Sequence, residues 1–280
     1  MLRKELTVAL AVVGAMVPFA VQADQPMAGG HAAPAASTYV AGEEVMAGQL
    51  PGGYNQSANY VIADGYDMYL TADYIYWHLN READGISEDA SYSSGFQVGL
   101  GIDMKGMDDW NLEGQYTWYQ NSGNHDSHKF SYNDAHLGFS RPFYFGKSLT
   151  ADFSTALRGL WISDEFEGHQ KSWAVGPRFG FDSNWLLGSG FRLIGDMSQS
   201  VLYTRYTERK GSNDYNTLRA VTETSLGLGW GSYFGDMNDF HFDLTVSYDF
   251  NIYWNQFAGA GSNFGNDYLQ GLNVGLRFDF

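Results

Sequence analysis

The chain has 280 residues, no cysteine and a formal charge of −16 at pH 7. The lack of cysteine excludes disulfides, thiolate metal sites and cysteine nucleophiles, and so acidic a chain repels nucleic acid. One long apolar run stands near the start and no second one follows, which excludes a helical membrane protein. Aromatic residues make up 16% of the chain, and 34 residues are glycine. This composition suits a β-barrel with aromatic girdles and closely approaching strands.

The first 23 residues have the features of an export signal. A short basic start, 1–4, precedes an uncharged apolar run over 6–20, and residues 21–23 supply the small side chains that a signal peptidase reads. An apolar run of about 15 residues is short for a membrane-spanning helix, which needs about 20. We therefore predict a signal peptide over 1–23, cleaved before Asp24. No cysteine stands at this point, which excludes a lipid-anchored lipoprotein.

Residues 24–65 have a different character from the rest of the chain. The stretch 25–36 is low in complexity, rich in alanine, glycine and proline, and shows no periodicity. Such a segment cannot bury enough apolar area to offset the entropy lost on ordering. We predict a flexible segment that lies in the periplasm or folds into the lumen of a barrel, and the sequence leaves both open.

From Tyr66 onward, apolar and polar residues alternate in a series of segments. Side chains alternate across a strand, so such a pattern has one apolar face and one polar face. The last segment ends the chain on an aromatic residue, and its apolar face holds Leu272, Val274, Leu276, Phe278 and Phe280. An apolar-out, polar-in strand that closes on phenylalanine is typical of the last strand of an outer-membrane barrel.

Ten such segments follow one another, the first over about 66–79 and the second over about 93–103. Short turns follow the even segments, at 105–109, 145–148, 184–190 and 235–239, and Pro142 is expected to end its strand. Longer polar gaps follow the odd segments, at 80–90, 122–129, 164–171, 208–214 and 255–266. The prediction is an all-β fold: one antiparallel up-and-down transmembrane barrel over 66–280, of ten strands, with eight or twelve still possible. Both ends would lie in the periplasm, with the longer gaps as extracellular loops.

Two sets of outward side chains are assigned roles at the membrane. The set expected to form a membrane-interface belt is Tyr74, Tyr76, Trp110, Trp118, Trp161, Trp173, Trp230 and Trp254. A sugar-stacking platform is the weaker alternative, because most of these rings fall on the predicted lipid face. The second set is the C-terminal assembly signal, read by the barrel-assembly machinery: Leu276, Phe278 and Phe280.

The inward face carries charges of both signs. The same alternation points eleven acids and five arginines into the lumen, and these candidate pore-lining residues are Asp73, Asp103, Glu113, Asp134, Asp152, Arg158, Arg178, Asp182, Arg192, Asp196, Arg219, Glu223, Asp243, Asp249, Arg277 and Asp279. In a narrow barrel they would pair into a salt-bridged core that holds the wall together. In a hydrated barrel they would form an acidic channel that favours cations. Both interpretations remain open.

No catalytic centre is predicted. His125, His128 and the stretch 164–169 fall in predicted outer loops, for which a solvated surface is the ordinary explanation. His241 and Asp243 share the lumenal face, but no serine or cysteine accompanies them. Two loop histidines make an incomplete metal site. We therefore expect no enzymatic activity, no metal and no cofactor.

Several segments carry a resemblance to a known family: 71–77, 95–101, 109–112, 157–162, 173–185, 253–256 and 270–274. In this order they resemble the pore-forming outer-membrane proteins typified by the Legionella major outer-membrane-like proteins, which are distantly grouped with chlamydial major porins. The resemblance covers nearly all of 66–280 and implies a pore-forming barrel of the Gram-negative outer membrane. Chlamydial porins are rich in cysteine, so their cross-linked envelope behaviour does not carry over to this chain.

The function that the sequence predicts is porin-like: passive, cation-leaning passage of ions or small solutes across the outer membrane of a Gram-negative bacterium. The alternative is a non-conducting structural or surface-recognition barrel whose outer loops bind a partner. Short loops count against adhesion, and a packed lumen would count against conduction. The expected partners are outer-membrane lipid and lipopolysaccharide, the barrel-assembly machinery through the C-terminal strand, and small solutes or ions, with no nucleic acid.

Overall fold

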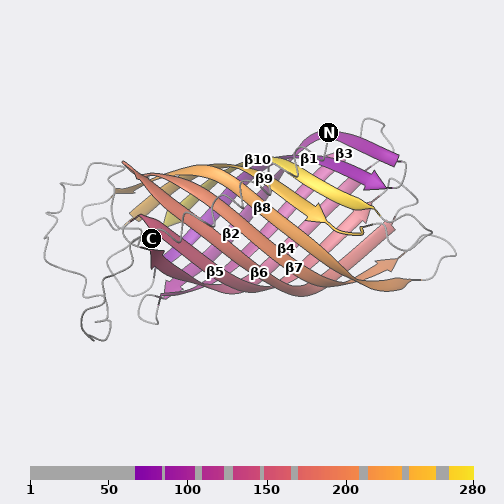
Figure 1. Cartoon of the computed structure of the whole chain (residues 1–280), viewed down its shortest axis with the longest axis horizontal. Coiled ribbons are helices and arrows are strands. Elements are labelled where there is room, and N and C mark those ends of the chain that lie inside the picture. The colour runs from indigo at the N-terminus through magenta and orange to yellow at the C-terminus, as the bar shows by residue number, and fades with distance from the viewer. Residues whose placement is uncertain are drawn as a thin grey trace, which may run out of the picture. The chain divides into compact units, whose positions relative to one another are not determined.

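The computed structural model describes residues 67–83, 86–104, 109–122, 129–145, 148–164, 170–207, 214–234, 240–256 and 265–280. These residues form ten antiparallel strands that close into one barrel (Figure 1). Among them, no helix is long and apolar enough to cross a membrane. The signal peptide expected over 1–23 and the segment expected over 24–65 lie outside the described residues and stay predictions.

The strands follow one another around the ring in chain order, as predicted. They are β1 (Asp67–Ala83), β2 (Ile86–Met104), β3 (Trp110–Ser122), β4 (Lys129–Phe145), β5 (Leu149–Asp164), β6 (Gln170–Gly188), β7 (Phe191–Thr207), β8 (Tyr215–Phe234), β9 (Phe240–Tyr253) and β10 (Asn266–Asp279). The prediction of a ten-stranded antiparallel barrel is confirmed.

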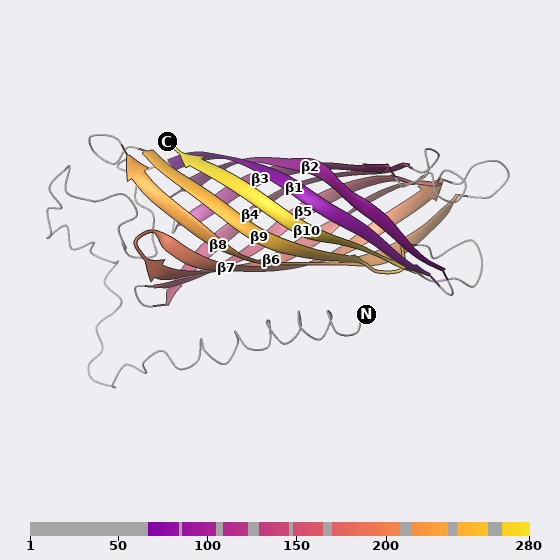
Figure 2. The ribbon, with the colours of Figure 1, turned by 90° about the horizontal axis from the view of Figure 1, so that it is seen from above.

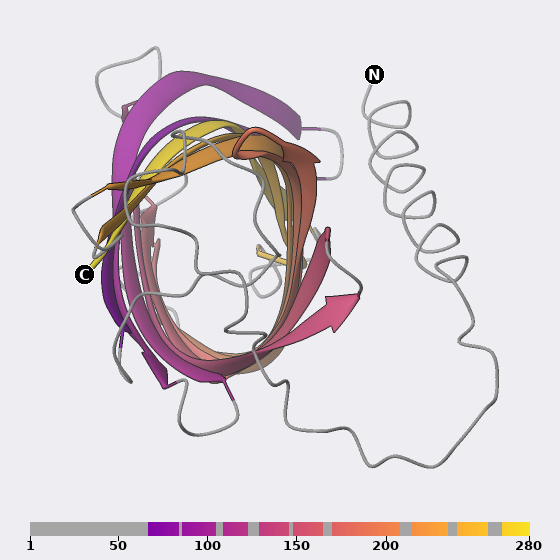
Figure 3. The same ribbon diagram turned by 90° about the vertical axis from the view of Figure 1, so that its left-hand side faces the viewer.

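The last strand closes the barrel by pairing with the first (Figure 2). The backbone N–H of Phe280 donates to the carbonyl of Met68 at 2.9 Å, and the N–H of Met68 donates to the carbonyl of Phe280 at 3.1 Å. Seen along its axis, the ring of strands is complete (Figure 3), so every strand has a neighbouring strand on each side. We call the end where β1 begins and β10 ends the terminal rim, and the opposite end the far rim.

Side chains alternate between the lumen and the outer surface along each strand. On β1, Tyr74 and Tyr76 are exposed on the outside, whereas Ile75 and Trp77 are buried inside. The same alternation places large apolar side chains outward from all ten strands. The sequence pattern of period two therefore predicts correctly which face points outward.

Strand boundaries differ from the prediction at two connections, 80–90 and 184–190, and at Pro142. β1 and β2 continue through most of the predicted gap 80–90, because their polar residues keep pairing up to Ala83 and Ile86. β6 continues to Gly188, and the turn predicted over 184–190 is reduced to Ser189 and Gly190.

Pro142 does not end its strand, contrary to the prediction. β4 runs on to Phe145, and Pro142 is in register with Asp152 of β5. The pairing of β4 with β3 stops at Ser140, so the rest of β4 pairs on one side only. A proline is tolerated there because it need not donate to a second neighbouring strand.

Candidate functional site in the barrel lumen

An apolar layer crosses the lumen toward the far rim. All ten strands contribute buried side chains to it, none more than 8% exposed: Ile75, Trp77, Leu79, Ala90, Tyr119, Phe130, Tyr132, Leu160, Ile162, Ala174, Leu202, Val221, Tyr253 and Leu269. A water-filled passage at this level would leave these inward side chains accessible. Their burial means that they pack on one another and fill the cross-section.

The clearest contact in the layer joins opposite walls. Tyr132 lies on β4 and Tyr253 on β9, and these strands are five steps apart around the ring in either direction. The hydroxyl of Tyr253 donates to that of Tyr132 at 2.8 Å, and their ring centroids are 5.8 Å apart. The ring of Trp77 from β1 packs edge-on against Tyr132 at 6.4 Å. Side chains from opposite walls therefore meet in the middle of the lumen.

Arg158 ties this layer to the charged part of the lumen. Its guanidinium donates to four surrounding oxygens, those of Asp134 at 2.5 Å, Glu223 at 2.6 Å, Tyr132 at 3.1 Å and Ser200 at 3.2 Å. Glu223 also accepts from Arg178 at 3.2 Å and from Ser198 at 2.6 Å. Charges that are buried need such partners, because leaving one uncompensated is costly.

A second bridge crosses the lumen between the layer and the far rim. Arg81 on β1 donates to Asp164 on β5 at 2.6 Å and to Asp267 on β10 at 3.0 Å. β1 and β5 are four steps apart in the ring, so this ion pair also spans most of the lumen. Nearby, Arg219 donates to Gln256 at 2.6 Å. Side-chain contacts thus cross the far half of the lumen at two successive levels.

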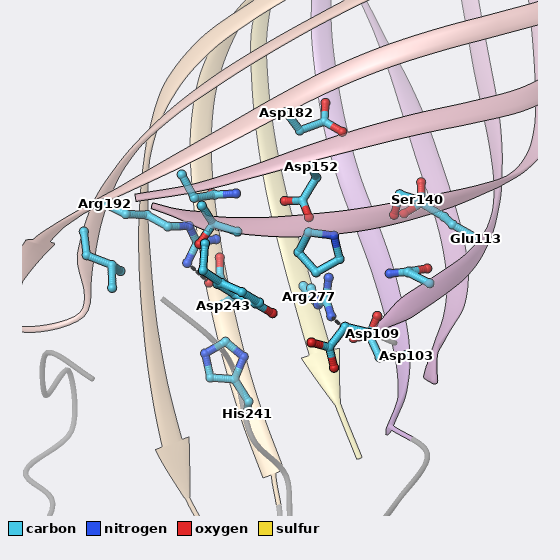
Figure 4. Close-up of a pocket in the computed structure, with 16 residues that line it drawn as sticks. Asp103, Asp109, Glu113, Ser140, Asp152, Asp182, Arg192, His241, Asp243 and Arg277 are labelled. Atoms are coloured by element: carbon cyan, nitrogen blue, oxygen red, sulfur yellow. Dashed lines mark hydrogen bonds and ion pairs between the residues drawn. The ribbon is translucent and has the colours of Figure 1, made fainter. Parts of the chain in front are cut away.

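Two cavities lie between the layer and the terminal rim. The central cavity, about 360 Å³, lies under the layer and is lined among others by Asp73, Trp77, Asp196 and Asp249. The terminal cavity, about 240 Å³, is lined by Asp103, Asp152, Arg192, Asp243, Arg277 and further residues near the terminal rim (Figure 4). Glu113, Ser140 and Asp182 line both. Both of these cavities therefore lie in the half of the barrel next to the terminal rim.

The sixteen charged residues predicted to face the lumen all have inward side chains. Seven line the terminal cavity, and six more line the central cavity. The other three, Arg158, Arg219 and Asp279, are buried in hydrogen-bonded or ionic contacts. Whether these residues line a conducting passage stays a prediction.

The apolar layer is the part of the site that sequence reasoning missed. Its inward residues stand where apolar side chains occupy both faces of a strand, as in the run 74–77 on β1 and 160–162 on β5. The loss of alternation at these runs is the signal that could have located the layer.

The predicted belt and the predicted assembly signal lie on the outer surface. Of the eight belt residues, six are exposed, whereas Trp118 and Trp230 are half-buried between neighbouring strands. Leu276, Phe278 and Phe280 are exposed at the end of β10. Their roles at a membrane and in assembly stay predictions.

The histidines that sequence analysis weighed for catalysis do not form a triad in the described part of the chain. The Nδ1 of His241 lies 2.9 Å from Asp279, and Asp243 is paired with Arg192. His125, His128 and residues 165–169 lie outside the described residues. Within the described ranges, no group of three or more histidine or acidic side chains is placed to hold a metal ion.

Comparison with known proteins finds solved structures that are similar to this chain at low sequence identity. No model of a protein family matches it, and no curated protein does. The outer membrane protease OmpT from Escherichia coli is 8% identical, with 80% of this chain and 99% of that chain covered and a TM-score of 0.45. The translocator domain of the autotransporter NalP from Neisseria meningitidis is 14% identical, with 78% and 89% covered and a TM-score of 0.39. Neisserial surface protein A is 12% identical, with 76% and 96% covered and a TM-score of 0.31.

At these sequence identities and TM-scores, the similarities say nothing about the activity of this chain. They also leave the resemblance to Legionella outer-membrane proteins as a prediction.

Proposed function

We propose that the protein is a non-conducting β-barrel of the Gram-negative outer membrane that keeps its lumen closed and presents its far rim to the outside. The outer surface supports a membrane location. Large apolar side chains point outward from every strand, and some are as exposed as Leu137 at 61% and Leu218 at 70%. So continuous an apolar surface matches hydrocarbon rather than water. A closed barrel also satisfies every ladder hydrogen bond without water, as a bilayer requires.

The proposal of a closed lumen rests on one observation, the contact between Tyr132 and Tyr253. Of the two functions that the sequence leaves open, porin-like passage needs a continuous aqueous path. Side chains fill the interior of an eight-stranded barrel, and only wider barrels leave a clear channel. In this ten-stranded barrel, two tyrosines of opposite strands meet within a layer to which every strand contributes. The arrangement favours the structural or surface-recognition role.

Cation-leaning passage remains the second candidate, because carboxylates outnumber arginines in the lining of both cavities. Such a lining attracts cations once it is hydrated. Passage would require the layer around Tyr132 and Tyr253 to open. The acidic cavities would then form the inner part of the path.

Single-channel recording in a planar bilayer with a salt gradient tests the proposal. The wild-type protein should give no current steps. The variant Trp77→Ala/Tyr132→Ala/Tyr253→Ala should give steps, because it removes the side chains that meet across the lumen. A matched control, Tyr74→Ala/Trp161→Ala/Trp173→Ala, removes three aromatic rings from the outer surface and should stay silent.

Heat-modifiable migration in detergent gels checks that each variant is folded. Wild-type steps with a cation-selective reversal potential would overturn the closed state and favour the porin-like function. Silence of the folded lumenal variant would show that the layer is not what closes the barrel.

A further inference from the structure

The outer face of four neighbouring strands carries positive charge only. These strands are β4, β5, β6 and β7, which follow one another in the ring (Figure 1). The chain has a formal charge of −16, yet the described outward positions of these strands hold no aspartate or glutamate. Their charged residues are four cations: Lys129, Arg141, Lys171 and Arg205. The other six described lysines and arginines all point into the lumen.

Three of the four outward cations gather at the far rim. Lys129 is the first residue of β4, Lys171 the second of β6, and Arg205 the third from the end of β7. We call these three residues, all of them exposed, the rim cluster. Arg205 is paired with the exposed Asp214 at 2.6 Å, whereas Lys129 and Lys171 form no ion pair with a described residue. Since exposed ion pairs are weak, all three charges are available to an external anion.

Aromatic rings place the rim cluster at the edge of the apolar surface. Trp173 of β6 is in register with Arg205 of β7 and with Trp161 of β5. Lys171 stands on the same face of β6 two residues from Trp173, about 7 Å along the strand toward the far rim. In the other direction, the outward side chains of β5 and β6 are mostly apolar. Tryptophan favours the boundary between membrane and water, so the rim cluster lies at the level of lipid headgroups.

The rim cluster presents two separate cationic points. Lys129 on β4 is two strand spacings from Lys171 on β6, about 10 Å, and Arg205 lies on the strand next to Lys171. Ser131 of β4 and Ser163 of β5 are in register with each other, and Ser163 is in register with Lys171. Lysine and arginine bind phosphate, and serine hydroxyls donate and accept hydrogen bonds. The arrangement suits a sugar that carries two separated phosphate groups.

We propose that the rim cluster binds the lipid A part of lipopolysaccharide, which is a disaccharide with a phosphate at each end and several acyl chains. One phosphate lies at Lys129 and the other between Lys171 and Arg205. The acyl chains lie along the apolar surface below Trp161 and Trp173. This proposal rests on the proposed function for the outward placement of the far rim, but not for the closed lumen. A phospholipid with one phosphate would leave one of the two cationic points unused.

Native mass spectrometry of the protein refolded in detergent without lipopolysaccharide tests the site. Lipid A with two phosphates should bind more tightly than lipid A with one, and both should bind more tightly than phosphatidylglycerol. Lys171→Gln should weaken binding of the bisphosphorylated form about fivefold, the usual contribution of one cation at an anionic lipid surface. Lys129→Gln/Lys171→Gln should weaken it about 25-fold, because contributions of separated sites add. Both variants replace exposed side chains and should fold, which gel migration with and without heating checks.

Arg141→Gln is the matched control. It also removes an outward cation, but Arg141 lies toward the terminal rim, 5.9 Å from the ring centroid of Trp110, so lipid A affinity should hardly change. Three results would overturn the proposal: equal affinity for lipid A and phosphatidylglycerol, wild-type affinity in Lys129→Gln/Lys171→Gln, or equal losses in Lys171→Gln and Arg141→Gln. The first and the third would mean a general attraction to anionic lipid.

Cysteine labelling separates this proposal from the proposed function. The chain has no cysteine, so Thr207→Cys places a single thiol at the far rim, where Thr207 is exposed. A membrane-impermeant maleimide should label it in intact cells. Labelling without lipid A binding would overturn the lipid A site alone. Labelling only after cell lysis would overturn the outward placement of the far rim, and the lipid A site with it.

Discussion

Replacing Arg158 with methionine would test how far buried ions hold the two walls of the lumen together. The Arg158 side chain is 1% exposed and lies 2.5 Å from Asp134 and 2.6 Å from Glu223. Methionine keeps much of the volume but removes the charge, so two carboxylates lose a shared cation where water is excluded. Removing one partner of a buried ion pair costs about 3–5 kcal/mol. Glu223 still has Arg178 as an ion-pair partner at 3.2 Å. We therefore expect the free energy of unfolding to fall by about 3 kcal/mol, the lower end of this range.

The free energy of unfolding can be measured by guanidinium titration of the folded barrel in lipid vesicles, followed by tryptophan fluorescence. Arg205→Met is the matched control. Arg205 is also paired with an aspartate, Asp214 at 2.6 Å, but both side chains are exposed at the far end of the wall. Exposed ion pairs contribute little to stability. The unfolding midpoint of Arg205→Met should therefore match that of the wild type.

A double variant separates the loss of charge pairing from the loss of packing. Arg158→Met/Asp134→Asn removes one cation and one carboxylate and leaves Glu223 paired with Arg178, so it should be more stable than Arg158→Met alone. If Arg158→Met unfolds like the Arg205→Met control, or if the double variant is less stable than the single one, the reasoning from buried charge is refuted.

Three further predictions test the outer surface, a strand contact and the end of the chain. Leu244 points outward from β9 at 36% exposure, so Leu244→Arg should cost about 2–4 kcal/mol in a bilayer; a neutral result would mean that this position does not face hydrocarbon. A Cβ on Gly271 would lie 2.2 Å from the carbonyl oxygen of Tyr76, so Gly271→Ala should lower stability by about 1–3 kcal/mol in urea titrations. Gly114→Ala, whose Cβ would meet ordinary contacts from 3.5 Å, should cost less, and equal losses would refute the steric argument. Phe280→Ala should reduce the folded protein recovered from cell outer membranes but not the yield of refolding in detergent; equal reductions would make Phe280 a stability residue rather than an assembly signal.

The sequence predicted the barrel because its main signal is local. Side chains alternate with a period of two whatever the rest of the chain does, and the pattern over 240–250 is enough to assign both faces of β9. Strand ends are harder to predict. Ladder hydrogen bonds continue beyond the apolar stretch, so a polar segment such as 80–83 still pairs as a strand. Polarity shows where the apolar surface stops, not where the sheet stops.

The closure of the lumen could not be derived in the same way. Tyr132 and Tyr253 are 121 residues apart in sequence, and the alternation says only that both point inward. Whether two inward side chains reach the same level depends on the number of strands and on their stagger around the ring. These are properties of the closed barrel, so the layer becomes visible only when all ten strands are in register.

The two interpretations of the charged lumen turn out to describe different parts of it. Around Arg81 and Arg158, the acids are paired and the walls are joined, as in a salt-bridged core. At Asp152 and Asp182, like charges face each other across neighbouring strands beside a cavity, as in a hydrated acidic site. A lumen built for free passage would not carry the apolar layer. Together, the two parts describe a barrel that is packed toward the far rim and has acidic cavities on the side of the terminal rim.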